Sequence, residues 1–408
     1  MDIEVAVIGG GAAGIAAARR LHSAGVNCLL VEARPRLGGR AWTIPGPGGA
    51  ALDLGCEWLH SGDENPWTEI AEGAGHSVDH SIAPWVRRSV GPNFPLAEQA
   101  DFQRARNAYY ERLEVLARRP VDAPASDALE PGNRWNPMMI AIGTYISGAE
   151  LSRVSAQDLE AYADTGVNWR IPAGYGTVIA GHGAGLPVAL DCPVTRIEHG
   201  GRGVLLDTPR GKLRAEQAIV TVPSDLIAER AITFSPALPE KQEAAAGLPL
   251  GLADKLFLSL EDAEEFEPDG RLFGRIDRAA TGNYHFRPYG APLIEAYFAG
   301  PCAAELEKGG EAAFFAFAAE ELTGVLGADF ARRIKPIASH AWRADPFARG
   351  SYSYALPGMA RCRDILAASV AEKLFFAGEA CSRADYSTAH GAYRTGIAAA
   401  EQVLAARG

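Results

Sequence analysis

The sequence of 408 residues contains few cysteines, few methionines and no long apolar segment. Its 6 cysteines are scattered, without a CxxC pair or metal-ligand spacing, so we expect reduced thiols, no metal site and no disulfide framework. Internal repeats and low-complexity tracts are also missing. Lys and Arg number 39 against 50 Asp and Glu, and the resulting net charge of −11 argues against nucleic acid as the main partner.

The chain also lacks the marks of a membrane or exported protein. No apolar run is long enough to cross a bilayer, and the first apolar segment starts almost at Met1, without a signal peptide before it. We therefore expect a cytoplasmic protein without a membrane-bound part. A hydrophobic content of 48% and a charged content of 22% are ordinary for a globular protein, and the length suffices for two domains.

The N-terminal segment VAVIGGGAAGIAAARRLHSAGVNCLLVE is the most informative part of the chain. The apolar run from Val5 to Ile8 predicts a buried parallel strand that leads into a GxGxxG turn and an Ala-rich helix. In such a turn, Gly9 permits the tight bend, Gly11 lets the backbone approach a pyrophosphate, and Gly14 lets the helix pack on the strand. The helix N-terminus then offers unpaired N–H groups to phosphates.

A second predicted strand, Cys28 to Val31, ends in Glu32. A carboxylate at this point can accept both hydroxyls of an adenosine ribose, whereas it would repel a 2′-phosphate. A lone GxGxxG motif is weak, because glycine-rich turns are common. Here strand, turn, helix, second strand and acid follow in order, which favours a dinucleotide site over an ordinary glycine turn.

Changes of sequence pattern divide the chain into five predicted segments. A nucleotide-binding domain is assembled from residues 1–76, 172–250 and 341–408. Between them lie a helical substrate domain, 77–171, and a strand-rich segment of the substrate domain with one long helix, 251–340. The helical part gives the weakest signal, and its topology is not predicted.

Several motifs in combination resemble the flavin amine oxidase family, which includes monoamine oxidases, polyamine oxidases and flavin histone demethylases. Besides the N-terminal segment, they are LDLGCEWLH, GLADKLFLSL, AWRADPFARGSYSY and LFFAGEACSRADYSTAHGAYRTG. The resemblance covers the cofactor half well and the helical part hardly at all. It implies an α/β fold with a Rossmann-like FAD-binding domain of the glutathione-reductase and amine-oxidase type, and an interleaved α+β substrate domain.

The resemblance also implies how FAD is held. Arg34 and the stretch Leu37 to Arg40 resemble a second phosphate-contacting loop that simple NAD dehydrogenases lack. Glu379 would bind the ribityl chain, and the N–H of Ala389, at the start of the closing helix, would face the flavin N1–C2=O edge. Because Gly-Ser precedes Tyr352 where monoamine oxidases place a flavin-linking cysteine, we expect non-covalent FAD. The expected cofactor-binding residues are Gly9, Gly11, Ala13, Gly14, Glu32, Ala33, Arg34, Gly38, Gly39, Arg40, Gly55, Glu57, Trp58, Val194, Trp342, Gly378, Glu379 and Ala389.

Lys255 interrupts an otherwise apolar predicted strand, where a buried ammonium is costly. From the residues alone, an edge lysine whose head reaches solvent is the simpler interpretation. The resemblance instead implies a catalytic lysine that holds a water against flavin N5 and tunes reoxidation by oxygen.

The same resemblance implies an aromatic wall at the reacting carbon. Tyr352, with Trp342 nearby, would face the amine and attract its cationic form. Thr388 stands where monoamine oxidases complete the wall with a second tyrosine, a departure shared with polyamine oxidases and demethylases. His60, after Trp58 and one aliphatic residue, resembles a histidine of the spermine and acetylpolyamine oxidases and would bind an internal nitrogen of a chain-like substrate. A structural histidine is the alternative, and Glu57 is a weaker site candidate without an evident partner.

The sequence thus predicts FAD-dependent oxidation of a primary or secondary amine, with polyamine-like amines preferred. A hydride would pass from the α-carbon to flavin N5, the imine would hydrolyse, and O2 would reoxidise the flavin to give hydrogen peroxide. The partners expected are the amine and O2, and the protein is expected to be a monomer or homodimer. The nearest alternative is an L-amino-acid oxidase, for which Arg87, Arg88 and Arg170 are candidate carboxylate ligands. A desaturase and a non-catalytic FAD-binding scaffold are weaker alternatives.

Overall fold

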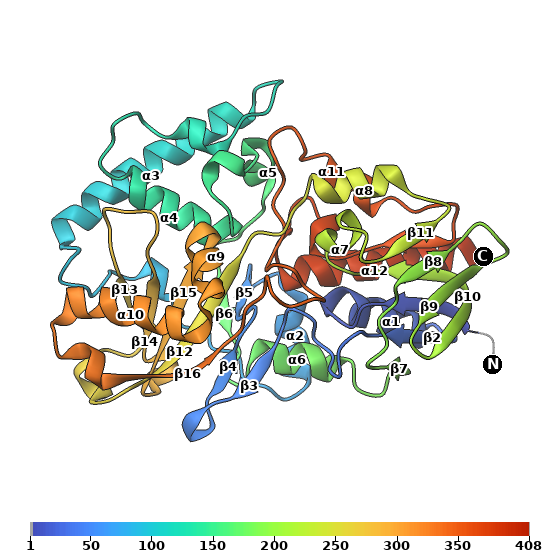
Figure 1. Ribbon diagram of the computed structural model, residues 1–408, viewed down its shortest axis with the longest axis horizontal. Coiled ribbons are helices and arrows are strands. Elements are labelled where there is room, and N and C mark those ends of the chain that lie inside the picture. The colour runs from blue at the N-terminus through green and yellow to red at the C-terminus, as the bar shows by residue number, and fades with distance from the viewer. Residues whose placement is uncertain (1–2, 408) are drawn as a thin grey trace.

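The computed structural model describes residues 3–407 and contains two large sheets (Figure 1). Residues of both sheets line one cavity. The first sheet has eight strands in the order β11-β8-β9-β10-β1-β2-β7, with β17 paired to β10. Its strands are β1 (Ile3–Ile8), β2 (Cys28–Val31), β7 (Val188–Ala189), β8 (Arg196–Glu198), β9 (Val204–Thr208), β10 (Gly211–Val220), β11 (Thr233–Ser235) and β17 (Leu374–Phe376). The four strands β2, β1, β10 and β17 run parallel, as a dinucleotide-binding fold requires.

Two helices from opposite ends of the chain pack side by side against this parallel core. They are α1 (Ala12–Ser23) and α12 (Ala389–Arg407), the blue and red helices beside each other in Figure 1. The contact is close because small residues face each other: a Cβ added at Gly396 would lie 2.2 Å from the carbonyl oxygen of Ala13. The end of the chain is thereby brought to the glycine-rich turn at its beginning.

The second sheet is antiparallel and forms one wall of the cavity. Its order is β13-β14-β15-β12-β16, with bounds β12 (Ala253–Leu260), β13 (Gly270–Phe273), β14 (Asn283–Phe286), β15 (Leu293–Ala299) and β16 (Ile334–Ser339). Side chains alternate along a strand, so Leu256 and Leu258 pack in a hydrophobic cluster with Phe314 of α10 (Gly310–Leu326). Residues at the intervening positions point to the other face, where Ala253 and Lys255 line the cavity.

The helical part closes the cavity from a third side. Helices α3 (Leu96–Ala117), α4 (Asn136–Ser147) and α5 (Ala156–Ala161) share a hydrophobic cluster and lie above the second sheet in the view of Figure 1. The remaining helices and strands are β3 (Thr43–Pro45), β4 (Ala51–Asp53), β5 (Trp58–His60), α2 (Pro66–Gly73), β6 (Asn168–Arg170), α6 (Tyr175–His182), α7 (Ser224–Ala228), α8 (Pro239–Ala246), α9 (Gly300–Lys308) and α11 (Cys362–Ala367).

The predicted α/β fold class is confirmed, and the predicted strand Cys28 to Val31 matches β2 residue for residue. The five domain boundaries stay a prediction. Within residues 3–407, no helix combines the length and the apolar character needed to cross a membrane.

Candidate active site

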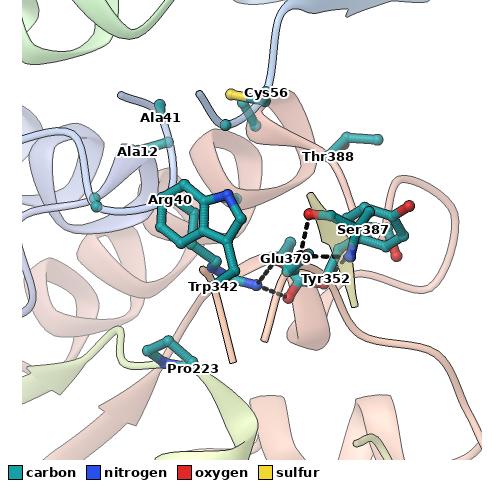
Figure 2. A pocket seen from close by; sticks show the side chains of 18 of the residues that line it. Ala12, Arg40, Ala41, Cys56, Pro223, Trp342, Tyr352, Glu379, Ser387 and Thr388 are labelled. Atoms are coloured by element: carbon teal, nitrogen blue, oxygen red, sulfur yellow. Dashed lines mark hydrogen bonds and ion pairs between the residues drawn. The ribbon is translucent and has the colours of Figure 1, made fainter. Parts of the chain in front are cut away.

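A cavity of about 1070 Å³ runs from the glycine-rich turn to the second sheet. This volume lies at the upper end of the usual range for ligand sites, as expected for a cofactor together with a substrate. Every residue predicted to bind the cofactor or act in catalysis lines the cavity, with the exception of Gly14. Figure 2 shows part of the lining, with Glu379, Tyr352 and Ser387 close together and Trp342 beside Arg40.

The glycine-rich turn leaves room for a phosphate group. A Cβ added to Gly11 would meet nothing closer than Gly39, at 3.9 Å, and both residues line the cavity. At Gly14, in contrast, a Cβ would lie 1.8 Å from the carbonyl oxygen of Gly9. Gly14 therefore serves the packing of helix on strand, which explains why it does not line the cavity.

Glu32 is held in place by the backbone around it. Its Oε2 accepts a hydrogen bond from the N–H of Gly10 at 2.5 Å, and its Oε1 accepts one from the N–H of Arg34 at 2.8 Å. The carboxylate is buried at the end of β2 and lines the cavity. A carboxylate oxygen can accept more than one hydrogen bond, so this position fits the predicted contact with ribose hydroxyls.

Glu379 lies at the centre of a second polar cluster (Figure 2). Its carboxylate accepts hydrogen bonds from Arg40 Nη1 at 2.8 Å, from Ser353 Oγ at 2.6 Å and from the N–H of Ser387 at 3.0 Å. Burial alone would raise the pKa of Glu379, but Arg40, Ser353 and Arg363 outweigh it and hold the pKa below its ordinary value. The acid is therefore ionised and rigidly oriented beside the cavity.

The N-terminus of α12 opens onto the same cavity. The hydroxyl oxygen of Thr388 accepts a hydrogen bond from the N–H of Gly391 at 3.0 Å, so Thr388 caps the helix. The hydroxyl hydrogen of Thr388 goes to the carbonyl of Asp385 at 2.6 Å. Thr388, which stands where a second tyrosine was considered, thus has its hydroxyl engaged in hydrogen bonds with backbone groups. Ala389 follows it as the first residue of the helix.

Lys255 is buried, with 6% of its surface exposed, on a strand in the interior of the second sheet. The interpretation of an edge lysine that reaches solvent is therefore wrong. Its ammonium nitrogen lies 2.8 Å from Glu57 Oε2 and 2.9 Å from Glu295 Oε1. Glu57, for which the sequence indicated no partner, is thus an ion-pair partner of Lys255.

These three groups set one another's protonation. Burial would lower the pKa of Lys255, but Glu295 and Glu57 raise it above its ordinary value, so the lysine stays charged. Burial raises the pKa of Glu57, but Lys255 outweighs this effect and lowers it to about 2. Burial, together with the neighbouring charge of Glu57, raises the pKa of Glu295 to about 8. At neutral pH, Glu57 and Lys255 form the ion pair and Glu295 keeps its proton.

Glu57, Glu295 and His285 together offer ligand atoms at metal-binding spacing. The ammonium of Lys255 occupies the position next to both carboxylates, and Nε2 of His285 lies 2.9 Å from Oδ1 of Asp269. The groups are therefore engaged with one another, and we interpret the cluster as a buried ion-pair network.

Two aromatic side chains are fixed beside this network. The indole N–H of Trp342 donates to the carbonyl of Leu54 at 3.0 Å, and the residue is almost completely buried. The hydroxyl of Tyr352 donates to the carbonyl of Tyr145 at 2.5 Å and lies 2.8 Å from the hydroxyl of Tyr297. Because each polar tip has a partner, the two rings are held in place at the cavity wall.

His60 lies on β5, and its ring also lines the cavity. Nδ1 lies 2.6 Å from Oδ1 of Asn168, and because an amide oxygen only accepts, Nδ1 carries the hydrogen. Burial lowers the pKa of His60, which favours the neutral ring with an unprotonated Nε2. Trp58 lies on the same strand, two residues earlier, and its ring packs on that of Trp85.

The arginines considered for an amino-acid oxidase do not reach the cavity. Arg87 and Arg88 are exposed, and Arg170 is buried in ion pairs with Asp79 and Asp269, each at 2.9 Å.

Sequence reasoning missed the polar side chains that the second sheet and helices α3 and α4 contribute to the cavity. They are Arg106, Tyr145, Arg271, Asn283, His285, Glu295 and Tyr297. A signal for them was present in the sequence. Polar residues alternate with apolar ones in LIEAYFA, at Glu295 and Tyr297, which indicates a strand with one polar face.

The chain is similar in sequence to curated proteins of plants. It is 30% identical over 436 residues to lysine-specific histone demethylase 1 homolog 2 of Oryza sativa subsp. japonica, covering 98% of this chain and 57% of that protein. It is 29% identical over 441 residues to polyamine oxidase 2 of Arabidopsis thaliana, covering 98% of this chain and 87% of that protein. The chain therefore spans little more than half the length of the demethylase homologue.

Among solved structures, the fold matches putrescine oxidase bound to putrescine with a TM-score of 0.76 at 19% identity, over 99% of both chains. At this identity the likeness concerns the fold. A sequence profile described as flavin containing amine oxidoreductase matches residues 12–82 and 67–404, which together span nearly all of the described chain. The glycine turn, the buried acids and the lysine-bearing sheet thus belong to a chain that is a member of the flavin-containing amine oxidoreductase family.

Proposed function

We propose that this protein oxidises an elongated primary or secondary amine with non-covalently bound FAD. One observation carries the proposal: the charged Lys255, paired with Glu57, and the fixed ring of Tyr352 share a cavity with the glycine turn and Glu32. The relatives named polyamine oxidase, and the family itself, support the same reaction class.

The lining of the cavity fits FAD. The open side of Gly11 and the fixed Glu32 suit a pyrophosphate and a ribose, and Gly378, at φ +140°, has open space where a Cβ would stand. Glu379 and the N-terminus of α12 would hold the ribityl chain and the flavin edge. When bound, the flavin accepts the hydride that leaves the amine's α-carbon and passes the electrons on to O2.

The aromatic wall favours the neutral form of the amine. A hydride can leave only when the nitrogen offers its lone pair, whereas a free alkylamine has a pKa of about 10, as lysine does. Transfer into a site walled by Trp342 and Tyr352 lowers this pKa by desolvation. The two rings thereby prepare the amine for oxidation and fix its position.

Lys255 is a fixed cation rather than a base. An ammonium group has three hydrogens, and two of them point to Glu57 and Glu295. The third is left for a water molecule, and we propose that this water serves the hydrolysis of the imine and the reaction with O2. The ionised Glu57 opposes the loss of a proton from Lys255, and Glu57 and Glu295 together keep its head at one place.

His60 gives the proposed preference for chain-like, polyamine-like amines. Its unprotonated Nε2 can accept a hydrogen bond from an N–H group within the substrate, because Asn168 holds the hydrogen on Nδ1. The exposed acids Glu160 and Asp164 also line the cavity and would attract the cationic form of an incoming amine.

The direct test is anaerobic reduction of the purified flavoprotein by candidate amines. Spermine, spermidine, their N-acetylated forms, monoamines and L-amino acids are added in turn, and bleaching of the flavin absorbance is followed. Bleaching by a chain-like amine supports the proposal. Bleaching by α-amino acids alone would move the assignment to an amino-acid oxidase, and no bleaching by any amine would refute amine oxidation.

A further inference from the structure

The cavity wall formed by the second sheet ends in a positively charged region. Across the sheet, Arg271 of β13 pairs in register with His285 of β14, which pairs with Glu295 of β15. Directly paired residues of an antiparallel sheet point to the same face, so Arg271 lies on the same wall as the Lys255 network, at its far end. Arg106 of α3 lines the cavity as well.

Neither of these two arginines forms an ion pair within residues 3–407. Arg271 donates from Nε to Oδ1 of Asn283 at 2.9 Å, and its guanidinium lies over the ring of Phe273. The Nε atom of Arg106 is buried and has no hydrogen-bond partner among the described residues. Arginines that are fully buried, such as Arg363, which is paired with Asp158 at 2.7 Å, do have a carboxylate partner, whereas Arg271 and Arg106 are half-buried.

Two unneutralised guanidinium groups beside one cavity are unfavourable without an anion. Burial lowers the pKa of Arg271 to about 10; the neighbouring Tyr145 partly opposes this shift, and the nearby charge of Arg106 adds to it. The nearest acid along the wall, Glu295, is engaged with Lys255 and is separated from Arg271 by the β14 strand. A buried donor without a partner also costs free energy, which a ligand oxygen would recover.

We infer that Arg271 and Arg106 form an oxyanion-binding subsite, and that the elongated amine of the proposed function carries a carboxylate at its far end. An arginine presents several N–H donors in one plane, which matches the geometry of a carboxylate. The inference rests on the proposed function for the reacting end of the substrate and adds the chemistry of the distal end.

The spacing favours an ω-amino carboxylate over an α-amino acid. Arg271 is three strands away from Phe257, which stands two residues after Lys255 on β12. With strands about 4.8 Å apart, the Cα atoms of Arg271 and Phe257 are separated by roughly 14 Å. A substrate whose carboxylate lies several carbons from the reacting amine matches this span better than one that carries both groups on the same carbon.

Three probes with the same number of carbons test this subsite on the holoenzyme: ε-aminocaproate, n-hexylamine and L-norleucine. We expect ε-aminocaproate to reduce the flavin with a KM roughly tenfold or more below that of n-hexylamine, with L-norleucine the poorest. Arg271→Gln and Arg106→Gln should each remove most of the advantage of ε-aminocaproate, by raising its KM far more than that of n-hexylamine. Arg104→Gln, on the same helix as Arg106, and Arg275→Gln, outside the cavity, are matched controls.

A second readout does not depend on turnover. Caproate, which has the carboxylate without the amine, should perturb the flavin spectrum on binding, and Arg271→Gln should weaken its affinity roughly tenfold. If no amine bleaches the flavin but caproate binds in this way, the proposed function fails and the subsite stands. If ε-aminocaproate and n-hexylamine reduce the flavin with equal KM, the subsite is refuted and amine oxidation stands. The same conclusion follows if spermidine has the lowest KM and Arg271→Gln lowers that KM further.

Discussion

The buried network of Glu57, Lys255 and Glu295 gives a prediction about stability that separates two chemically identical side chains. Glu57 is the ionised partner of Lys255 at 2.8 Å, whereas Glu295 keeps its proton at neutral pH. Glu295→Gln replaces a neutral acid by a neutral amide of the same shape, and Glu57→Gln removes a charge. We therefore expect the two single variants to lower the free energy of unfolding by different amounts. The cost of the double variant should differ from the sum of the two single costs.

The magnitudes follow from the burial of Lys255. Glu295→Gln leaves the ion pair intact, so its cost in the free energy of unfolding should be about 1 kcal/mol or less. In Glu57→Gln, Glu295 loses its negatively charged neighbour, ionises and takes over the pair at 2.9 Å, which limits the cost to about 2 kcal/mol. The double variant leaves a buried ammonium without any charged partner, and breaking a buried pair in this way costs about 3–5 kcal/mol.

Urea unfolding of the holoenzyme at pH 7 measures these values. The transition is followed by far-UV circular dichroism and by flavin fluorescence, and the free energies are valid where both probes give the same transition.

The pH dependence of the stability provides a further check. Glu295 has an ordinary pKa of 4.5 and a folded-state pKa of about 8, so the native protein binds more protons between these values. The free energy of unfolding therefore falls as pH rises across this window. In Glu295→Gln, this dependence of the free energy of unfolding on pH should disappear. Equal costs for both single variants, with simple additivity in the double variant, would refute the assignment of charges.

Three other predictions concern the reaction and the cofactor. Lys255→Met should slow flavin reduction or reoxidation roughly tenfold or more in stopped-flow experiments, whereas Lys241→Met, at a buried lysine outside the cavity, should leave both half-reactions unchanged. The value of kcat/KM should rise with pH across neutrality, because desolvation lowers the amine's pKa; a flat profile would contradict the need for a neutral amine. Gly11→Val should reduce the flavin content of the purified protein, since its side chain would enter the cavity, whereas Gly181→Ala in α6 should retain it.

Most of the features predicted for the cofactor half of the cavity depended on local sequence motifs. The strand, turn and helix around Gly9 to Gly14 depend on neighbours in the sequence, and the positions of Glu32 and Glu379 follow from the ends of their strands. Lys255 was identified through a family resemblance. Its burial was misjudged from the residues alone, because its place inside a five-stranded sheet depends on later strands, the last of which, β16, begins 79 residues after Lys255 at Ile334.

By itself, the sequence determined the α/β class and the dinucleotide-binding turn. These features are set by periodicity and by short-range turn chemistry. Only the tertiary structure decided which charges meet: Glu57 with Lys255, 198 positions apart, and Arg271 beside Arg106 without an acid. The physical reason is that charge pairing depends on strand register and on the approach of separate segments, and no local pattern in a chain encodes these distances.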